Sequence, residues 1–164
     1  MFNSPIDKIV FDVSHQTYAH KALTGRAYTY IDPERYGEAS GFANPDESEH
    51  DLFAMGHTST SVSLGCGLAH ARDLAGDAYN VITIIGDGSL SGGLAFEGFN
   101  NAAELDSNLI IIVNDTAAAL TIQGFFGCFY FFAHLKFLRK MKIALPIFFG
   151  RALCFGLSIL LLRA

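Results

Sequence analysis

An aspartate between two glycines follows an apolar run, and a second apolar run ends in an asparagine. The first run, at 81–85, leads into Gly-Asp-Gly around Asp87, and the second, at 109–113, precedes Asn114. Magnesium binds oxygen ligands and shares its coordination shell with protein groups, waters and a phosphate. Glycines have no Cβ, which lets a diphosphate approach backbone N–H groups. The pattern predicts a metal and diphosphate site with Asp87 as metal ligand, although Gly-Asp-Gly also serves in ordinary turns.

The residues around these runs predict an α/β fold. The runs at 81–85 and 109–113 are rich in β-branched residues, as in parallel strands covered on both faces, and 92–105 supplies the crossover helix between them. A strand at 8–13 and a helix at 59–74 continue the alternation. We expect an incomplete, three-layer parallel sheet whose ligands collect at the carboxyl ends of its strands.

The earlier of the two expected helices contains residues that indicate how it packs. Gly65 and Gly67 permit close approach to a neighbouring element, and Cys66 is expected to be buried. His70 and Arg72 are expected to face solvent. A sheet of only three strands would leave one edge bare, which predicts marginal stability or association.

Five short segments occur in an order that is specific to one enzyme family. They are Asp-Val-Ser-His-Gln-Thr-Tyr-Ala-His-Lys at 12–21, Leu-Thr-Gly-Arg at 23–26, Glu-Ser-Glu-His-Asp at 47–51, Gly-His-Thr-Ser-Thr-Ser at 56–61 and Gly-Asp-Gly at 86–88. In this order they resemble the 1-deoxy-D-xylulose-5-phosphate synthase family. The resemblance runs from about Asp7 to about Asp115.

The resemblance implies a transketolase-like transferase with the thiamine-diphosphate-binding fold. Enzymes of this family condense pyruvate with glyceraldehyde 3-phosphate and release carbon dioxide, which supplies isoprenoid, thiamine and pyridoxal precursors. It implies thiamine diphosphate and Mg²⁺ as cofactors and a homodimer. The alternatives are a non-catalytic remnant or cofactor-binding module, and half of another transketolase-like enzyme, because that wider class shares the same metal and diphosphate layout.

Carried over position by position, the resemblance assigns roles to single residues. His15 lies beside the cofactor and His57 belongs to the segment that contacts it, so these two are the candidate catalytic residues, while Asp87 is the metal ligand. Imidazoles donate to phosphate oxygens or move protons near neutral pH. Hydroxyls and amides at the start of a helix bind anions, with simple helix capping as the alternative. The other cofactor-binding candidates are Gly56, Thr58, Gly88, Ser89, Asn114 and Thr116.

One position departs from the family pattern. The family has Asn-Asp-Asn, with the last asparagine as the second side-chain ligand of magnesium, where this chain has Asn114, Asp115 and Thr116. With Thr116 as metal ligand, its shorter and weaker hydroxyl predicts binding weakened by roughly 10- to 100-fold. Asn114 could compensate only if the end of the strand rearranges.

Two features of the family have no counterpart in these residues. The family's cofactor lies between a diphosphate-binding domain and a separate pyrimidine-binding domain, and the second domain carries the glutamate that activates the cofactor. No residue here matches that glutamate. We therefore expect an internal fragment of the diphosphate-binding domain that is inactive by itself.

The charge of the chain changes sign after Asp115. All 16 acidic residues and five of the 11 basic residues lie in 1–115, whereas 116–164 hold six basic residues and no acidic one. Such a change rarely occurs inside one domain. We expect 1–115 to form a partial thiamine-diphosphate-binding domain and 116–164 to form a non-homologous, apolar and basic tail, helical or irregular.

Three interpretations of the tail remain open. Residues 143–162 are long enough to cross a hydrocarbon core of about 30 Å, although Arg151 would cost roughly 2.5–3.5 kcal/mol on insertion. The tail could instead adsorb to a membrane surface through basic residues beside phenylalanines. The third interpretation is that it is translated out of the ancestral reading frame, with an evolved soluble core as the remaining alternative.

Composition also excludes some classes of function. The acidic balance of 1–115 argues against nucleic-acid binding. The three cysteines form no Cys-x-x-Cys pair, so we expect neither a zinc site nor a disulfide framework. No signal peptide is recognised at the N-terminus, and a cytoplasmic location in a reducing compartment fits this composition.

Overall fold

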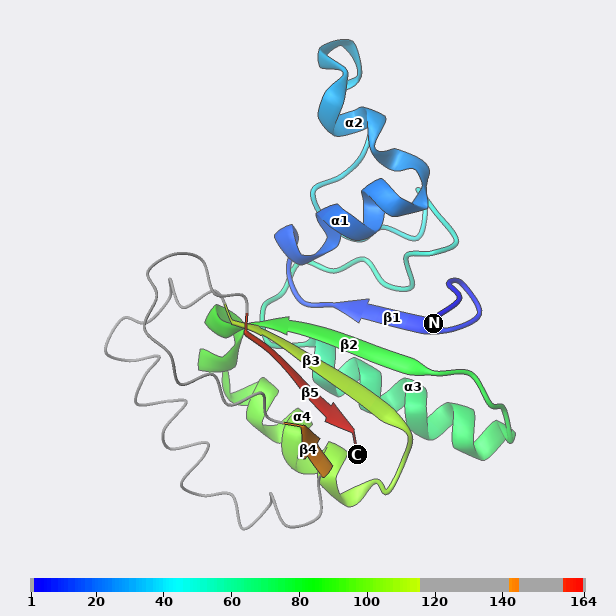
Figure 1. The fold of residues 1–164 in the computed structure, drawn as a ribbon, viewed down its shortest axis with the longest axis vertical. Helices are drawn as coiled ribbons and strands as arrows, with labels where there is room; N and C mark the ends of the chain where they lie inside the picture. Colours follow the sequence, from blue (N-terminus) through cyan, green and yellow to red (C-terminus); the bar gives the residue numbers. More distant parts are fainter. Residues whose placement is uncertain (1, 116–141, 145–157, 164) are drawn as a thin grey trace.

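Three parallel strands form the part of the sheet that the sequence predicts. The computed structural model describes residues 2–115, 142–144 and 158–163. The strands are β1 (Lys8–Phe11), β2 (Val81–Gly86) and β3 (Leu109–Asp115), with β2 between the other two. Both pairings are parallel, so the carboxyl ends of the three strands lie at the same end of the sheet (Figure 1). The α/β class and the parallel arrangement of these strands are confirmed.

Two helices connect these strands and pack on one face of the sheet. They are α3 (Ser61–Ala75), which precedes β2, and α4 (Gly93–Glu104), which joins β2 to β3. Their bounds lie within two residues of those expected from the sequence. In the described part of the chain, both long helices lie on the same face of the sheet. A layer of helices on the opposite face, which a three-layer fold requires, therefore stays a prediction.

The segment between β1 and α3 contains only short helices. These are α1 (Tyr18–Lys21) and α2 (Tyr28–Ile31), with a π-helical turn at Ala22–Arg26 between them and single 3-10 turns at His15–Thr17 and Pro33–Arg35. This segment rises beyond β1, on the side of the sheet away from β3 (Figure 1). Among the described residues, no helix combines the length and hydropathy needed to span a membrane.

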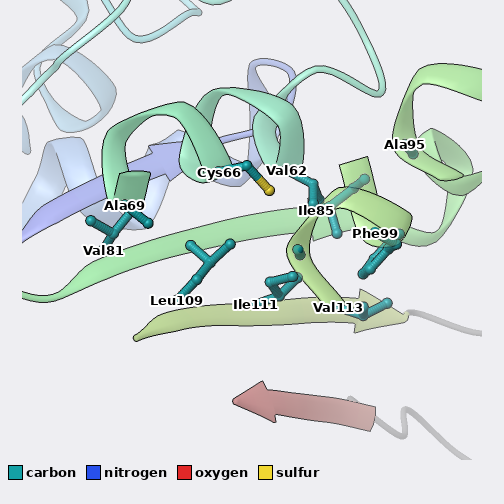
Figure 2. Packing of buried hydrophobic residues seen from close by; sticks show 11 residues of the cluster. Val62, Cys66, Ala69, Val81, Ile85, Ala95, Phe99, Leu109, Ile111 and Val113 are labelled. Atoms are coloured by element: carbon teal, nitrogen blue, oxygen red, sulfur yellow. The ribbon is translucent and has the colours of Figure 1, made fainter. Parts of the chain in front are cut away.

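The main core lies between the two long helices and one face of the strands (Figure 2). Alternate residues of β2 and β3 point into it because strand side chains alternate between faces. Burying each large aliphatic or aromatic side chain contributes roughly 1.5–3 kcal/mol, which fixes the helices over the strands. Its members are Val62, Cys66, Ala69, Val81, Ile85, Ala95, Phe99, Ala102, Leu109, Ile111 and Val113.

Cys66 and the two glycines beside it show how closely α3 packs. Cys66 is buried as expected, and burial raises the pKa of its thiol to about 11, which keeps the thiol protonated and unreactive. A Cβ on Gly65 would overlap Thr83 Cγ2, so close packing is confirmed there. Gly67 is exposed and has no such neighbour, so the same expectation is wrong for Gly67.

Arg72 is buried, which corrects the expectation that it faces solvent. Its side chain is 3% exposed, while His70 is exposed as expected. The guanidinium donates to Tyr79 O at 3.1 Å, Asn108 O at 2.8 Å and Ser107 Oγ at 2.9 Å. These bonds join the end of α3 to the segments just before β2 and β3. The planar guanidinium has five donors, which lets one side chain hold several acceptors together.

Two strands from beyond Thr116 extend the sheet. β5 (Ser158–Arg163) pairs antiparallel with β3, and β4 (Lys142–Ala144) pairs antiparallel with β5. The expectation of a helical or irregular tail is therefore wrong for these two segments, and the edge of β3 is paired, while β1 lies at the other edge of the described sheet. A short apolar run has no periodicity that separates strand from helix, and the edge of β3 offers N–H and C=O groups to a partner strand.

The remainder of the tail lies outside the described residues. This includes most of the range 143–162, for which a membrane-spanning helix was one interpretation. The ends of that range are strands. Surface adsorption and translation out of frame both stay predictions, as does the division of the chain after Asp115.

The packing of α3 on the sheet can be tested with two glycine substitutions. Gly65→Ala should lower the free energy of unfolding by about 1–3 kcal/mol, because the new methyl group overlaps Thr83. Gly67→Ala is the matched control, and should raise it by about 0.5–1 kcal/mol through helix propensity, since nothing lies within 4 Å. Urea denaturation measures both, and equal effects would contradict the close contact of Gly65.

Candidate functional site

The carboxyl ends of the three parallel strands carry the polar residues that the sequence predicts for a site. His15 and Gln16 follow β1, Asp87 follows β2, and Asn114 lies near the end of β3. The register pairs Gly86 with Asn114, and Asn114 Nδ2 donates to Gln16 Oε1 at 2.9 Å. The segment after β1 is thereby joined directly to β3, across the end of β2.

Two oxygen atoms at this edge are buried without a hydrogen-bond partner. Asp87 Oδ1 accepts from Gly88 N at 2.9 Å, but among the described residues Asp87 Oδ2 and Asn114 Oδ1 have no partner. A buried oxygen without a partner costs about 1–3 kcal/mol, and native proteins rarely leave one unexplained. A carboxylate and an amide oxygen on neighbouring strand ends are suited to binding Mg²⁺.

The described residues contain no group of three or more His, Cys, Asp and Glu side chains that could hold a metal ion. Magnesium at Asp87 and Asn114 would therefore take its other ligands from phosphate oxygens and waters. That is the usual arrangement when Mg²⁺ is bound together with a phosphorylated ligand. The residues present therefore fit a metal that arrives with a diphosphate.

The loop before α3 packs against the turn after β2. Thr58 Oγ1 donates to Ser89 Oγ at 2.9 Å, and Ser59 Oγ donates to Ser89 O at 2.6 Å. A Cβ on Gly92 would overlap Ser59 Oγ, so only glycine permits this approach. The structure thus brings together Thr58 and Ser89, two of the predicted site residues, and places the exposed His57 beside them on the same loop.

The hydroxyl side chains at 58–61 could have served only to cap α3, but the residue at the capping position does not do so. The residue before α3 is Thr60, and its side chain makes no capping hydrogen bond to the helix. Its hydroxyl instead donates to His57 O at 2.9 Å. The first amide of α3, Ser61 N, instead donates to Asp12, which follows β1.

Asp12 is a residue to which the sequence analysis gave no role. Its carboxylate is fully buried and accepts from Ser59 N at 2.9 Å and from Ser61 N at 3.0 Å. Ser59 has φ 72° and Val13 has φ 61°, both uncommon for residues other than glycine. Charge-assisted hydrogen bonds from these two amides to the buried carboxylate hold the strained loop in place. The only signal was its position in the Asp-Val-Ser-His-Gln segment.

The other predicted site residues are exposed or lie outside the described residues. His15, Gly56 and Gly88 are exposed, and no atom lies within 4 Å of a Cβ built on Gly88, which leaves space there for a ligand. Thr116, the predicted second metal ligand, is outside the described residues. Its role stays a prediction.

Parts of three of the family-like segments, 12–21, 23–26 and 47–51, form a buried cluster of charges. Arg26 Nη1 and Nη2 donate to Asp51 at 2.7 and 2.8 Å. The fully buried Lys21 lies 2.7 Å from Glu47 Oε2, and His20 Nε2 lies 3.3 Å from Asp51 Oδ1. These contacts fasten α1 and the turn after it to the segment at 47–51. Ion pairs therefore hold this part of the loop, while Ala43 and Met55 of the same segment pack with Val10 in a second, smaller core cluster.

The pKa of Asp51 records how strongly the cluster favours its carboxylate. Burial alone would raise this pKa, but contacts from Arg26, His20 and the backbone N–H of Asn44 hold it well below its usual range. The ion pairs therefore persist at neutral and mildly acidic pH.

The described residues form an α/β protein with a group of polar side chains at the carboxyl ends of its parallel strands. Residues 1–136 match the family model of 1-deoxy-D-xylulose-5-phosphate synthase. The chain therefore belongs to the 1-deoxy-D-xylulose-5-phosphate synthase family, which confirms the resemblance. The match extends past Asp115, where the sequence resemblance was expected to end.

Proteins named 1-deoxy-D-xylulose-5-phosphate synthase are similar to most of the chain. One from Dehalococcoides mccartyi is 52% identical over 121 residues, covering 74% of this chain and 19% of that protein. One from Pelotomaculum thermopropionicum is 48% identical over 120 residues, covering 73% of this chain and 19% of that protein. A third, from Geobacter sulfurreducens, is 45% identical over 145 residues, covering 86% of this chain and 22% of that protein. The chain spans about a fifth of the length of the curated relatives it matches.

Acidification should destabilise the protein through Asp51. Because its pKa in the folded protein lies below the unfolded value of about 4, the ion pairs stabilise the fold above that pH, and their contribution is lost as the pH falls toward the folded value. Asp51→Asn removes the two short charged contacts of Arg26 and leaves only the longer one to Glu47 Oε2 at 3.4 Å, and should cost about 3–5 kcal/mol at neutral pH.

Urea denaturation at several pH values checks this prediction. Below about pH 5 the stability of Asp51→Asn should depend less on pH than that of wild type. Glu38→Gln is the control, because Glu38 pairs with Arg35 on the surface and such pairs contribute little. If Asp51→Asn is as stable as wild type at neutral pH, the buried pairing is wrong.

Proposed function

We propose that these residues form the magnesium- and diphosphate-binding part of a thiamine-diphosphate site in a 1-deoxy-D-xylulose-5-phosphate synthase. The observation that carries the proposal is the pair of buried oxygens without described partners, Asp87 Oδ2 and Asn114 Oδ1, on neighbouring strand ends. Family membership supports it, because the matched proteins carry the name of this synthase. The comparisons favour this function over the alternatives of a remnant or another transketolase-like enzyme.

Each side chain has a distinct part in binding. Asp87 and Asn114 would hold Mg²⁺ through the two oxygens that lack described partners, where the ion would offset the negative charge of a diphosphate. Ser89 Oγ accepts from Thr58, so its own proton is available to a phosphate oxygen. The turn at Asp87–Ser91 leads into α4, whose N-terminus adds a favourable dipole for the anion.

The two candidate catalytic residues are exposed, as contact with a ligand requires. His15 lies in the segment that follows β1, and His57 lies in the loop that precedes α3. The hydrogen bonds that Asp12 accepts hold these two segments together. Thiamine diphosphate supplies carbanion stabilisation when bound. The imidazoles would orient phosphate oxygens and hold or transfer protons beside it.

The wider role is proposed by analogy with the family. We propose condensation of pyruvate with glyceraldehyde 3-phosphate with loss of carbon dioxide, in a cytoplasmic homodimer that contributes to isoprenoid and thiamine biosynthesis. The activating glutamate would come from a pyrimidine-binding domain, because no residue of this chain matches it.

Removing the carboxylate of Asp87 should abolish most of the affinity for the cofactor. Isothermal titration of Mg²⁺ and thiamine diphosphate should show Asp87→Ala weaker than wild type by more than the roughly 10- to 100-fold typical of outer-shell partners. Asp77→Ala is the matched control, because Asp77 is exposed and follows α3, at the opposite end of β2. Equal affinity of Asp87→Ala and wild type would refute the proposed site.

The departure at position 116 gives a second test. Thr116→Asn restores the family residue, and should strengthen binding of Mg²⁺ and thiamine diphosphate by roughly 10- to 100-fold if this residue contacts the metal. The same titration measures the change. An unchanged affinity would mean that position 116 is not a metal ligand in this chain.

A further inference from the structure

Three polar side chains form a continuous hydrogen-bonded row across the edge of the sheet. Asn114 Nδ2 donates to Gln16 Oε1 at 2.9 Å, and Gln16 Nε2 lies 3.2 Å from His15 Nε2. The row begins on β3 and ends in the turn that follows β1, and it crosses the end of β2 at Gly86. It includes two predicted site residues and one, Gln16, that has no role in the proposed binding of the cofactor.

The row fixes the orientation of every group in it. Because Gln16 Oε1 accepts from Asn114, the other end of the Gln16 amide is the donor, and His15 Nε2 must accept. An accepting Nε2 belongs to a neutral imidazole with its proton on Nδ1. At the other end, the donor group of Asn114 is occupied by Gln16, so Asn114 Oδ1 is left for another partner. This is one of the two buried oxygens without a described partner.

Local packing holds Gln16 in this position. A Cβ on Gly86 would lie 2.7 Å from Gln16 Nε2, so the absence of a side chain there makes room for the amide. The turn at His15–Thr17 is anchored by Thr17, which is fully buried and donates its hydroxyl to Ser14 O at 2.5 Å. Gln16 is therefore placed by backbone on one side and by an obligatory glycine on the other.

We infer that Gln16 is a positioning residue of the proposed site, an inference that rests on the proposed function. It directs Asn114 Oδ1 toward the metal and the Nδ1 proton of His15 toward the ligand. Asn114 then contributes its oxygen without a rearrangement of the strand end. The glycine before Asp87 serves a second purpose, since it admits the Gln16 side chain.

The tautomer of His15 tests this inference directly on the unliganded chain. Histidine ¹⁵N chemical shifts at about pH 8, above the ordinary histidine pKa, should show the proton of His15 on Nδ1 in wild type. Gln16→Met keeps a side chain of similar length and removes both hydrogen bonds, and should move the proton mainly to Nε2, the preferred position in water. Gly86→Ala should give the same change by displacing Gln16. The exposed His70 is the internal control.

Cofactor affinity and thermal stability complete the test. Gln16→Met should bind Mn²⁺ with thiamine diphosphate about 10-fold or more weakly than wild type, as for other residues that orient metal ligands. A purely structural Gln16 would lower the melting temperature and leave the His15 tautomer unchanged, which would overturn the inference, as would unchanged affinity. If wild type itself does not bind, the proposed function fails, while the tautomer still shows whether Gln16 orients His15.

Discussion

The parallel register of β2 and β3 is the constraint on which the rest of the site depends. It pairs Gly86 with Asn114, so the residues that follow one strand lie beside the end of the other. The core beneath these strands, with α3 and α4 packed on one face, makes this register costly to change, because a shift by one residue would turn every core side chain to the other face. Packing far from the site therefore determines the site geometry.

Buried charges perform the same task where apolar packing is thin. Between β1 and α3 the chain has only short helices and a small apolar cluster that includes Ala43 and Met55, and Asp12 and Lys21 are fully buried in this segment. Each has specific partners. Asp12 accepts hydrogen bonds from Ser59 N and Ser61 N, and Lys21 forms an ion pair with Glu47. Such contacts penalise the loss of either partner strongly, and so specify one arrangement of a long polar segment.

Most polar groups around the strand ends are satisfied, and this makes the exceptions informative. Thr58 and Ser59 donate hydrogen bonds to Ser89, and Asn114 Nδ2 donates to Gln16 Oε1. Among the described residues, the buried groups without a partner at the strand ends include two acceptors, Asp87 Oδ2 and Asn114 Oδ1. Because acceptors without donors attract cations, the pattern of satisfaction points to the same ligand chemistry as membership of the synthase family.

The sequence by itself determined the fold class, the three parallel strands, both long helices and the family. It could do so because strand and helix periodicities are local, and because the glycine and histidine segments keep their order along the chain. It also placed Asp87 and Asn114 at strand ends, since the runs before them are unbroken.

Only the tertiary structure decided which side chains act together. Asp12 and Ser59 are 47 residues apart, and Gln16 and Asn114 are 98 apart, so no local pattern relates them. Arg72 was expected at the surface because a charged residue near the end of a helix is usually solvated, yet the strand starts beside it supply carbonyl acceptors. Ser158–Arg163 became a strand because β3 had an open edge. In each case the partner is decided by the packing of distant segments, which a single sequence does not encode locally.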